Sequence, residues 1–251
     1  AARLGYRRSP RNGRKAKTKL RSIGVFVITP TGAGASINPG HARFLSGISA
    51  AAEGMNFAPV VHYLDEDRAK DLLASERQPP VLRQQALAGL IFLNRFPPDV
   101  VRGLSEQLPC VCLTHHARAP LADTVLSDAD AGIGELIERL RDLGHRRIGF
   151  AADGDRTHLH YVHQRFAAYF ESLTRLGLLY DPTDVSSLVP ETVGVDFREH
   201  VIRQTQAGVT AWACASDSLG VQVFEALKEA RRRIPEDVSV IGYDGNNEEL
   251  T

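Results

Sequence analysis

Residues 209–245 decide the fold class, and they read VTAWACASDSLGVQVFEALKEARRRIPEDVSVIGYDG. The stretch begins with a short apolar run, continues with a helical pattern at 217–233, and ends in a second short apolar run. Short apolar runs that alternate with longer helical patterns are typical of parallel sheets covered by helices on both faces. This stretch therefore predicts a strand–helix–strand unit of an α/β fold.

The same alternation extends back to residue 22. Apolar runs that predict strands occupy residues 22–30, 58–64, 87–94, 109–114, 124–128 and 145–153. Helical patterns lie between them, at 41–56, 98–108, 131–144 and 163–178. So many units exceed one small sheet, and we expect an α/β fold of two subdomains with doubly wound parallel sheets. Ligands of such sheets bind beyond the carboxyl ends of the strands, which predicts a cleft lined by loops at 30–41, 94–98, 114–120, 153–164, 215–217 and 243–247.

Charge is distributed unevenly along the chain. Residues 1–21 contain nine basic side chains and no acidic one, whereas the other 230 residues contain 21 basic and 30 acidic side chains. A basic arm on an acidic body is expected when the arm contacts nucleic-acid phosphates and the body does not. A disordered tail that only keeps the chain in solution has the same composition, so both interpretations stay open.

The composition predicts a soluble globular protein of the cytoplasm. No apolar run approaches the roughly 18 residues that a membrane span needs, and the basic N-terminus lacks the apolar core of a secretory signal. Three cysteines, Cys110, Cys112 and Cys214, are too few for a disulfide framework, and we expect them to be reduced and buried. Cys110 and Cys112 share one strand face without a second pair of ligands, which makes a poor zinc site.

Enzyme and metal motifs are weak. The segment TPTGAGASI (29–37) follows the first strand, but Ile37 stands where a dinucleotide-binding fingerprint needs its third glycine. His158, His160 and His163 could direct two imidazoles at one ion, although a polar loop that enters a helix explains them more simply. We therefore expect no enzyme, no cofactor and no bound metal.

Several segments resemble, in order and spacing, the lactose-repressor/galactose-repressor family of bacterial transcription regulators. The most specific are LGHRRIGF (143–150) and ASDSLGVQVFEALKEARRRIPEDVSVIGYDG (215–245). SIGVFVITP (22–30) and NPGHARFLSGISAAAEGMNF (38–57) are similar to the first strand and first helix of the family's core. The resemblance implies a periplasmic-binding-protein-like fold of two subdomains, a small-molecule effector, a homodimer, and DNA binding through a separate headpiece.

The resemblance also implies how the chain is divided. Residues 1–21 would hold the end of the headpiece and a basic hinge, 22–126 the N-terminal subdomain, 127–242 the C-terminal subdomain, and 243–251 a crossover back to the first subdomain. We expect the rest of the headpiece to precede the chain and a final strand and helix to follow it.

The hinge departs from the family pattern. The family places a leucine of a short hinge helix in the DNA minor groove. Here the segment has Pro10 and Gly13 and no leucine between residues 7 and 19. The charge for phosphate contacts remains, and we expect DNA contacts from five of its basic residues, Arg7, Arg8, Arg11, Arg14 and Lys15.

Two family effector contacts carry over with matching side chains. Arg165, in RFAAYF, matches the arginine that grips the effector, and Asp244, in GYDG, matches an acid at the crossover. A guanidinium presents paired donors and a carboxylate presents paired acceptors, which together suit the hydroxyls of a sugar or a related polar metabolite. A surface arginine at a helix start and a turn carboxylate are the alternatives.

Four further positions match less closely. Ser216 and Asp217 stand where the family usually has Asn-Asp; Asp217 directly precedes a helical pattern, so helix N-capping is its more natural role. Ser216 offers fewer hydrogen bonds than an amide, which suggests a different or smaller effector. Thr114 and Asp128 match positions that line the cleft, with structural roles as alternatives. Aromatic residues could stack on a sugar face, although such residues are more often core: Phe92, Tyr161 and Trp212.

These expectations combine into an effector-responsive regulator, most simply a repressor. A small molecule in the cleft would favour one arrangement of the subdomains, and the dimer would pass that preference to the headpieces. A solute-binding protein of a transport system, with the same fold and cleft, is the alternative. The basic arm and the headpiece-like residues argue against the transporter.

Overall fold

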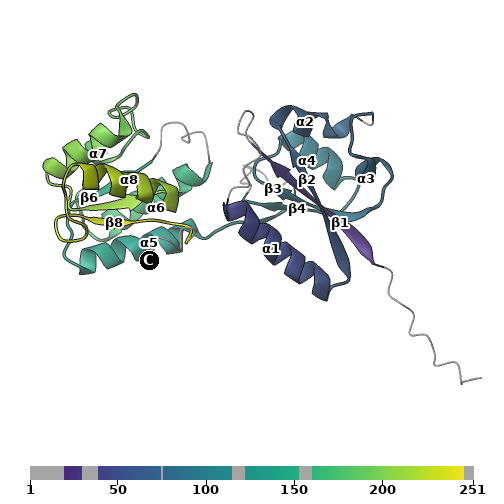
Figure 1. Cartoon of the computed structure of the whole chain (residues 1–251), viewed down its shortest axis with the longest axis horizontal. Helices are drawn as coiled ribbons and strands as arrows, with labels where there is room; N and C mark the ends of the chain where they lie inside the picture. The colour runs from purple at the N-terminus through teal and green to yellow at the C-terminus, as the bar shows by residue number, and fades with distance from the viewer. Residues whose placement is uncertain (1–19, 30–38, 75, 115–121, 153–159, 246–251) are drawn as a thin grey trace, which may run out of the picture. The chain divides into compact units, whose positions relative to one another are not determined.

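The computed structural model describes residues 20–29, 39–74, 76–114, 122–152 and 160–245 (Figure 1). The chain divides into two compact units, unit 1 (Ala1–Val125) and unit 2 (Leu126–Thr251). All paired strands run parallel in both units, which confirms the predicted α/β fold of parallel sheets.

Unit 1 is built on a five-stranded sheet in the order β2-β1-β3-β4-β5. Its strands are β1 (Arg21–Ile28), β2 (Phe57–Leu64), β3 (Leu87–Leu93), β4 (Cys110–Leu113) and β5 (Asp123–Val125). The helical segments are α1 (Pro39–Gly54), α2 (Glu66–Lys70), the 3-10 turn η2 (Asp71–Leu73), α3 (Pro80–Arg83) and α4 (Pro98–Ser105). The predicted strand at 124–128 is therefore shorter and ends at Val125.

Strand β1 shows why its sequence is apolar without alternation. Val25 and Val27 lie on one face and pack against Leu45 of α1, whereas Phe26 lies on the other face and meets the Phe92 ring edge-on at 6.5 Å. Val25, Phe26 and Val27 have no exposed surface. A central parallel strand is buried on both faces, so each of its positions favours an apolar side chain.

Unit 2 is built on a three-stranded sheet in the order β6-β7-β8. Its strands are β6 (Ile148–Ala151), β7 (Ala211–Cys214) and β8 (Ser239–Ile241). The helical segments are α5 (Ala129–Asp142), α6 (His160–Arg175), the 3-10 turn η4 (Pro182–Asp184), α7 (Phe197–Gln206) and α8 (Asp217–Glu229).

Trp212, the only tryptophan of the chain, lies at the centre of the unit 2 core. Its side chain is fully buried, and its indole Nε1 donates to Thr205 Oγ1 at 2.9 Å. A Cβ at Gly149, on the neighbouring strand, would lie 2.7 Å from two atoms of the indole ring. Glycine is therefore required opposite this tryptophan, because any side chain there would collide with the ring.

Candidate functional site

In unit 2, the carboxyl ends of the three parallel strands bring together the segments that follow β7 and β8. Residues 215–217 follow β7, and residues 242–245 follow β8. We call these two segments the carboxyl edge of unit 2. Open parallel sheets bind their ligands beyond such ends, so this edge is the candidate binding surface.

Arg165 reaches the carboxyl edge of unit 2 from helix α6. Its Nη1 donates to the carbonyl oxygen of Ala215 at 2.5 Å, and its Nη2 donates to Asp244 Oδ1 at 2.6 Å. The side chain is 7% exposed, and its buried Nε has no hydrogen-bond partner among the described residues. The structure therefore brings together the two residues that the sequence marked most strongly, and it leaves one guanidinium donor unused.

Two tyrosine rings lie against the Arg165 guanidinium. The guanidinium carbon is 4.8 Å from the centre of the Tyr161 ring and 4.0 Å from that of Tyr243. Tyr161 precedes Arg165 by one helical turn, which puts both side chains on one face of α6. Cations are attracted to the faces of aromatic rings, so both contacts hold the guanidinium in place.

Asp244 presents a carboxylate beside this cation. Its side chain is 27% exposed, and its backbone has φ of +112°, an unfavourable value for a residue other than glycine. Burial raises the pKa of its carboxyl, and the hydrogen bond from Arg165 lowers it in part. The pair thus offers donors and acceptors side by side, which is the combination that hydroxyl groups of a polar ligand require.

The N-cap of α8 is Ser216, not Asp217 as we expected. Ser216 has extended backbone angles, and its Oγ accepts from the backbone N–H of Leu219 at 3.4 Å. The same Oγ lies 2.9 Å from Ser218 Oγ, and the residue is only 4% exposed. Asp217 begins the helix instead, where a negative charge is favourable, and its N–H donates to the carbonyl of Tyr243 at 2.7 Å.

Asp128 has a structural role as a helix cap, whereas Thr114 lies exposed at the end of a strand. Asp128 is the N-cap of α5, and its side chain accepts from the N–H of Ala131 at 3.0 Å. Thr114 directly follows β4 in unit 1, is exposed, and has φ of +59°. A β-branched residue is uncommon in this left-handed region, so the conformation of Thr114 is strained.

The three aromatic candidates separate in the structure. Phe92 and Trp212 have no exposed surface and belong to the cores of unit 1 and unit 2. Tyr161 is half-buried and packs on Arg165. The five basic candidates of the arm (Arg7, Arg8, Arg11, Arg14 and Lys15) lie outside the described residues, as do His158 and the side chain of His160.

A polar pair at the carboxyl ends of the unit 1 strands was not predicted. Asn94 follows β3, and its Nδ2 donates to the carbonyl of Ile28 and lies 2.9 Å from His41 Nε2. Because Nδ2 carries the protons, His41 Nε2 accepts and its Nδ1 carries the ring proton. That Nδ1 is buried without a partner among the described residues, and burial lowers the pKa of His41. An asparagine at the carboxyl end of the apolar run 87–94 was the available signal.

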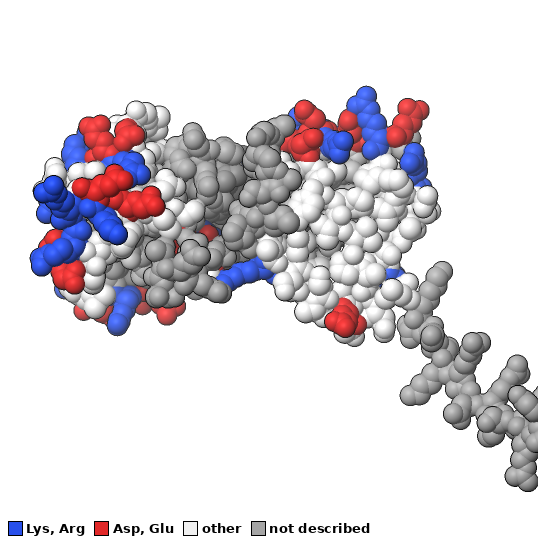
Figure 2. Space-filling view, viewed as in Figure 1, with Lys and Arg blue, Asp and Glu red and all other residues white. Residues whose placement is uncertain are grey.

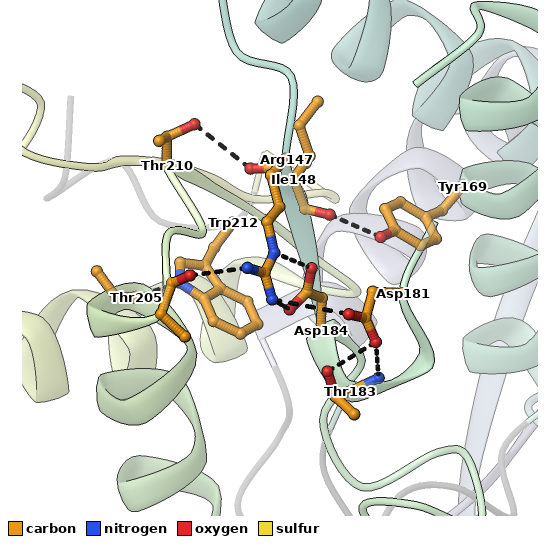
Figure 3. A network of polar contacts seen from close by, with 10 residues as sticks. Arg147, Ile148, Tyr169, Asp181, Thr183, Asp184, Thr205, Thr210 and Trp212 are labelled. Atoms are coloured by element: carbon orange, nitrogen blue, oxygen red, sulfur yellow. Dashed lines mark hydrogen bonds and ion pairs between the residues drawn. The ribbon is translucent and has the colours of Figure 1, made fainter. Parts of the chain in front are cut away.

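A second polar network lies at the amino ends of the unit 2 strands (Figure 3). Arg147 precedes β6 and donates to both carboxylate oxygens of Asp184, through Nε at 2.7 Å and Nη2 at 2.8 Å. The Asp184 side chain is 2% exposed. Nη1 of Arg147 donates to the carbonyl of Ala207 at 2.7 Å, and Tyr169 donates to the carbonyl of Ile148 at 2.7 Å. This network joins strand, turn and helix ends far from the carboxyl edge.

Two histidines of unit 2, the buried His200 and the half-buried His145, have lowered pKa values. Both ring nitrogens of His200 are buried without a partner among the described residues. Burial lowers the pKa of His200, the charge of Arg203 lowers it further, and Asp184 opposes both. Burial also lowers the pKa of His145, which bridges Thr210 and Ser239.

We expect His200→Leu to reduce the loss of stability on acidification. Below about pH 6.5 a histidine in the unfolded chain is protonated, whereas His200 in the folded chain stays neutral because its pKa is lowered. Falling pH therefore favours the unfolded chain. Between about pH 6.5 and about pH 5.5, one such histidine lowers the free energy of unfolding by at most about 1.4 kcal/mol. Urea unfolding, followed by circular dichroism at both pH values, measures it. His163→Gln, at an exposed position on α6, is the control, and an equal acid loss in wild type and His200→Leu would contradict the assignment.

Two features of the described residues bear on the class of protein. None of the helices there is both long and apolar enough to span a bilayer. Within the same residues, no three side chains of histidine, cysteine, aspartate or glutamate form a group that could hold a metal ion. The three cysteines are free and buried.

Comparison with known proteins gives a consistent result. Residues 137–251 match the family described as periplasmic binding protein-like domain. An uncharacterized HTH-type transcriptional regulator of Streptomyces limosus is 26% identical over 96% of this chain and 67% of its own length. The HTH-type transcriptional regulator CelR of Thermobifida fusca is 27% identical over 96% of this chain and 70% of its own length. The chain thus spans about two thirds of the length of these curated relatives.

Solved structures agree with these relatives. A complex of the transcriptional regulator CelR with cellobiose is 26% identical, covers 89% of this chain and 67% of its own, and has a TM-score of 0.69. A lac repressor dimer bound to operator and the anti-inducer ONPF is 19% identical, covers 92% of this chain and 77% of its own, and has a TM-score of 0.67, which supports the fold. The fold, the ordered motifs and these relatives agree: the chain has the fold of the effector-binding core of the lactose-repressor/galactose-repressor family and is similar to HTH-type transcription regulators.

Proposed function

We propose that this chain is the effector-sensing core of a transcription regulator, most simply a repressor, and that its effector is a sugar or a related polar metabolite. The observation that carries the proposal is the pair of Arg165 and Asp244 at the carboxyl edge of unit 2. The related regulator CelR has been solved with cellobiose, which supports a sugar as the class of ligand.

The chemistry of this pair suits a ligand rich in hydroxyls. A hydroxyl both donates and accepts, and here it meets a guanidinium donor and a carboxylate acceptor. The Nε of Arg165 is a buried donor without a partner among the described residues, and a ligand oxygen would satisfy it. The half-buried rings of Tyr161 and Tyr243 add the apolar surface against which a sugar ring packs.

The alternatives have less support. A solute-binding protein of a transporter would have the same fold, but the curated relatives are transcription regulators. We infer for the same reason that the chain is not an enzyme. A regulator acts where its DNA lies, which places the proposed function in the cytoplasm.

A panel of sugars tests the proposal. We expect at least one of cellobiose, glucose, sucrose and ribose to raise the melting temperature of the chain. A ligand at about 100 times its dissociation constant adds about 2.7 kcal/mol of stability, which corresponds to a rise of several degrees for a chain of this size. Differential scanning fluorimetry measures the shift, with sorbitol and sodium chloride at equal osmolarity as controls. A panel in which none of these sugars stabilises the chain would contradict a sugar as the effector class.

We further propose that the chain forms a homodimer through an apolar face of unit 1. Phe44 of α1 and Met55, which directly follows α1, are 42% and 68% exposed, and Val61 and Tyr63 of the edge strand β2 are each 39% exposed. The face of unit 1 displayed in Figure 2 shows a broad area without charged side chains. Exposed apolar side chains such as these four are typical of interfaces between proteins.

Sedimentation velocity tests the dimer. We expect the wild-type chain to sediment as a dimer at micromolar concentration and Phe44→Glu to shift it to the monomer, because a charge would be buried without a partner. Leu143→Glu, which charges an apolar side chain of unit 2 that is 58% exposed, is the matched control and should leave the dimer intact. A wild-type chain that remains monomeric would contradict the interface.

The basic arm is proposed to contact DNA phosphates. When its nine cations neutralise phosphates, the DNA releases the counterions that were bound to it. Such contacts therefore weaken steeply as salt rises, and they do not depend on base sequence. Sequence-specific reading of an operator is proposed to come from a headpiece of the kind that the relatives' names describe as HTH-type.

A further inference from the structure

Tyr243 connects three parts of unit 2. Its ring lies 4.0 Å from the guanidinium carbon of Arg165, and its carbonyl accepts from the N–H of Asp217 at 2.7 Å. Its hydroxyl donates to the backbone carbonyl of Asp128 at 3.2 Å. One side chain therefore touches the proposed effector-binding arginine and the start of helix α5.

The contact with α5 depends on a glycine. A Cβ at Gly132 would lie 2.6 Å from Tyr243 Cε2 and 2.9 Å from its hydroxyl oxygen. Glycine is the least favourable helix residue apart from proline, yet it stands here within α5. The close approach of the ring explains its presence, since any larger residue would push Tyr243 away from Asp128.

The position of Asp128 in the chain gives this contact its importance. Unit 2 begins at Leu126, so Asp128 lies on the segment through which the chain enters unit 2 from unit 1. Asp128 also begins α5 as its N-cap, and its carbonyl accepts from the N–H of Gly132 at 3.1 Å. The segment that joins the two units ends near Asp128. Through its hydrogen bond to Asp128, Tyr243 links that segment to the neighbouring residue Asp244.

We propose that Tyr243 is a positioning residue that couples the effector site to the segment joining the two units. The proposal rests on the function proposed for Arg165. A ligand that takes up the donors of Arg165 or the carboxylate of Asp244 changes how the guanidinium sits on the Tyr243 ring. The hydrogen bond from the Tyr243 hydroxyl transmits this change to Asp128. The backbone of residues 126–132 then becomes more or less protected from hydrogen exchange.

A double-mutant cycle tests the coupling without any ligand. The variants of the full chain are Arg165→Gln, Tyr243→Phe and both together, and the measurement is hydrogen exchange of the backbone amides of residues 126–132. We expect Arg165→Gln to change exchange there by about threefold or more in the presence of Tyr243, and not in the presence of the phenylalanine. Substitutions of two residues that act through one hydrogen bond have non-additive effects on exchange. If Tyr243 had a merely structural role, the effects of the two substitutions would add.

The controls separate coupling from a general loss of stability. Amides of β6 and β7 should exchange alike in all variants that fold normally. Tyr180→Phe removes a hydroxyl from a tyrosine that packs on Phe170 outside the site, and it should leave exchange at 126–132 unchanged. Equal effects of Arg165→Gln in both backgrounds would overturn the coupling. Because no sugar is used, this outcome is distinct from a failed sugar panel, which contradicts the proposed effector instead.

Discussion

Replacement of Asp184 by asparagine is expected to destabilise unit 2 by about 3 kcal/mol, at the lower end of the range for breaking a buried ion pair. Asp184 is almost fully buried and receives two hydrogen bonds from Arg147, whose side chain is 26% exposed (Figure 3). Removing the carboxylate charge leaves the guanidinium without its partner. The partial exposure of Arg147 lets water compensate in part, which is why we expect the lower value.

Fluorescence of Trp212 provides a specific readout for this variant. Trp212 is the only tryptophan of the chain and is buried in unit 2. Urea titrations that follow its emission therefore report the unfolding of that unit. Asp142→Asn is the control, because it breaks the ion pair between Arg141 and Asp142, in which both side chains are at least 36% exposed. Exposed pairs contribute little, so its midpoint should hardly move. A midpoint of Asp184→Asn that equals that of the control would contradict a stabilising network.

Replacement of Arg165 by alanine is expected to weaken binding of the stabilising sugar about a hundredfold. Hydrogen bonds to charged groups contribute about 1.5–3 kcal/mol each, and a factor of ten corresponds to 1.4 kcal/mol. The change also leaves Asp244 without its cation and removes the guanidinium between two tyrosine rings. Isothermal titration calorimetry with the sugar found in the panel measures the loss.

A matched variant on the same helix controls for this loss. Arg175→Ala removes an arginine of α6 that is 51% exposed and pairs with Glu138. It should bind the sugar as the wild type does. If Arg165→Ala also bound with unchanged affinity while Trp212 emission showed a native unit 2, Arg165 would be removed from the effector site.

The fold could be predicted because its sheets leave a direct signal in the sequence. Strand β1 is buried on both faces, so its residues form the continuous apolar run that marks a central parallel strand. The pairing of Arg165 and Asp244 at one site could also be proposed from the sequence, since both lie in short motifs that resemble one family, and the structure brings the two side chains into contact. Neither prediction required knowledge of how distant segments approach each other.

The contacts that depend on tertiary approach could not be predicted. Arg147 and Asp184 are 37 positions apart, and nothing local marks the turn that carries Asp184 as their meeting point. Tyr243 meets Asp128 across 115 positions, and Gly132 makes room for it only in the folded unit. The N-cap of α8 was predicted one residue late, because the extended backbone of Ser216 follows from where β7 ends rather than from side-chain preference.

The most direct measurement of the central claim is a crystal structure of the chain with the sugar that stabilises it. We predict that sugar hydroxyls lie within about 3 Å of the Arg165 guanidinium and of the Asp244 carboxylate, with the sugar ring near the Tyr161 and Tyr243 side chains. A sugar bound at a site that excludes both Arg165 and Asp244 would contradict the account.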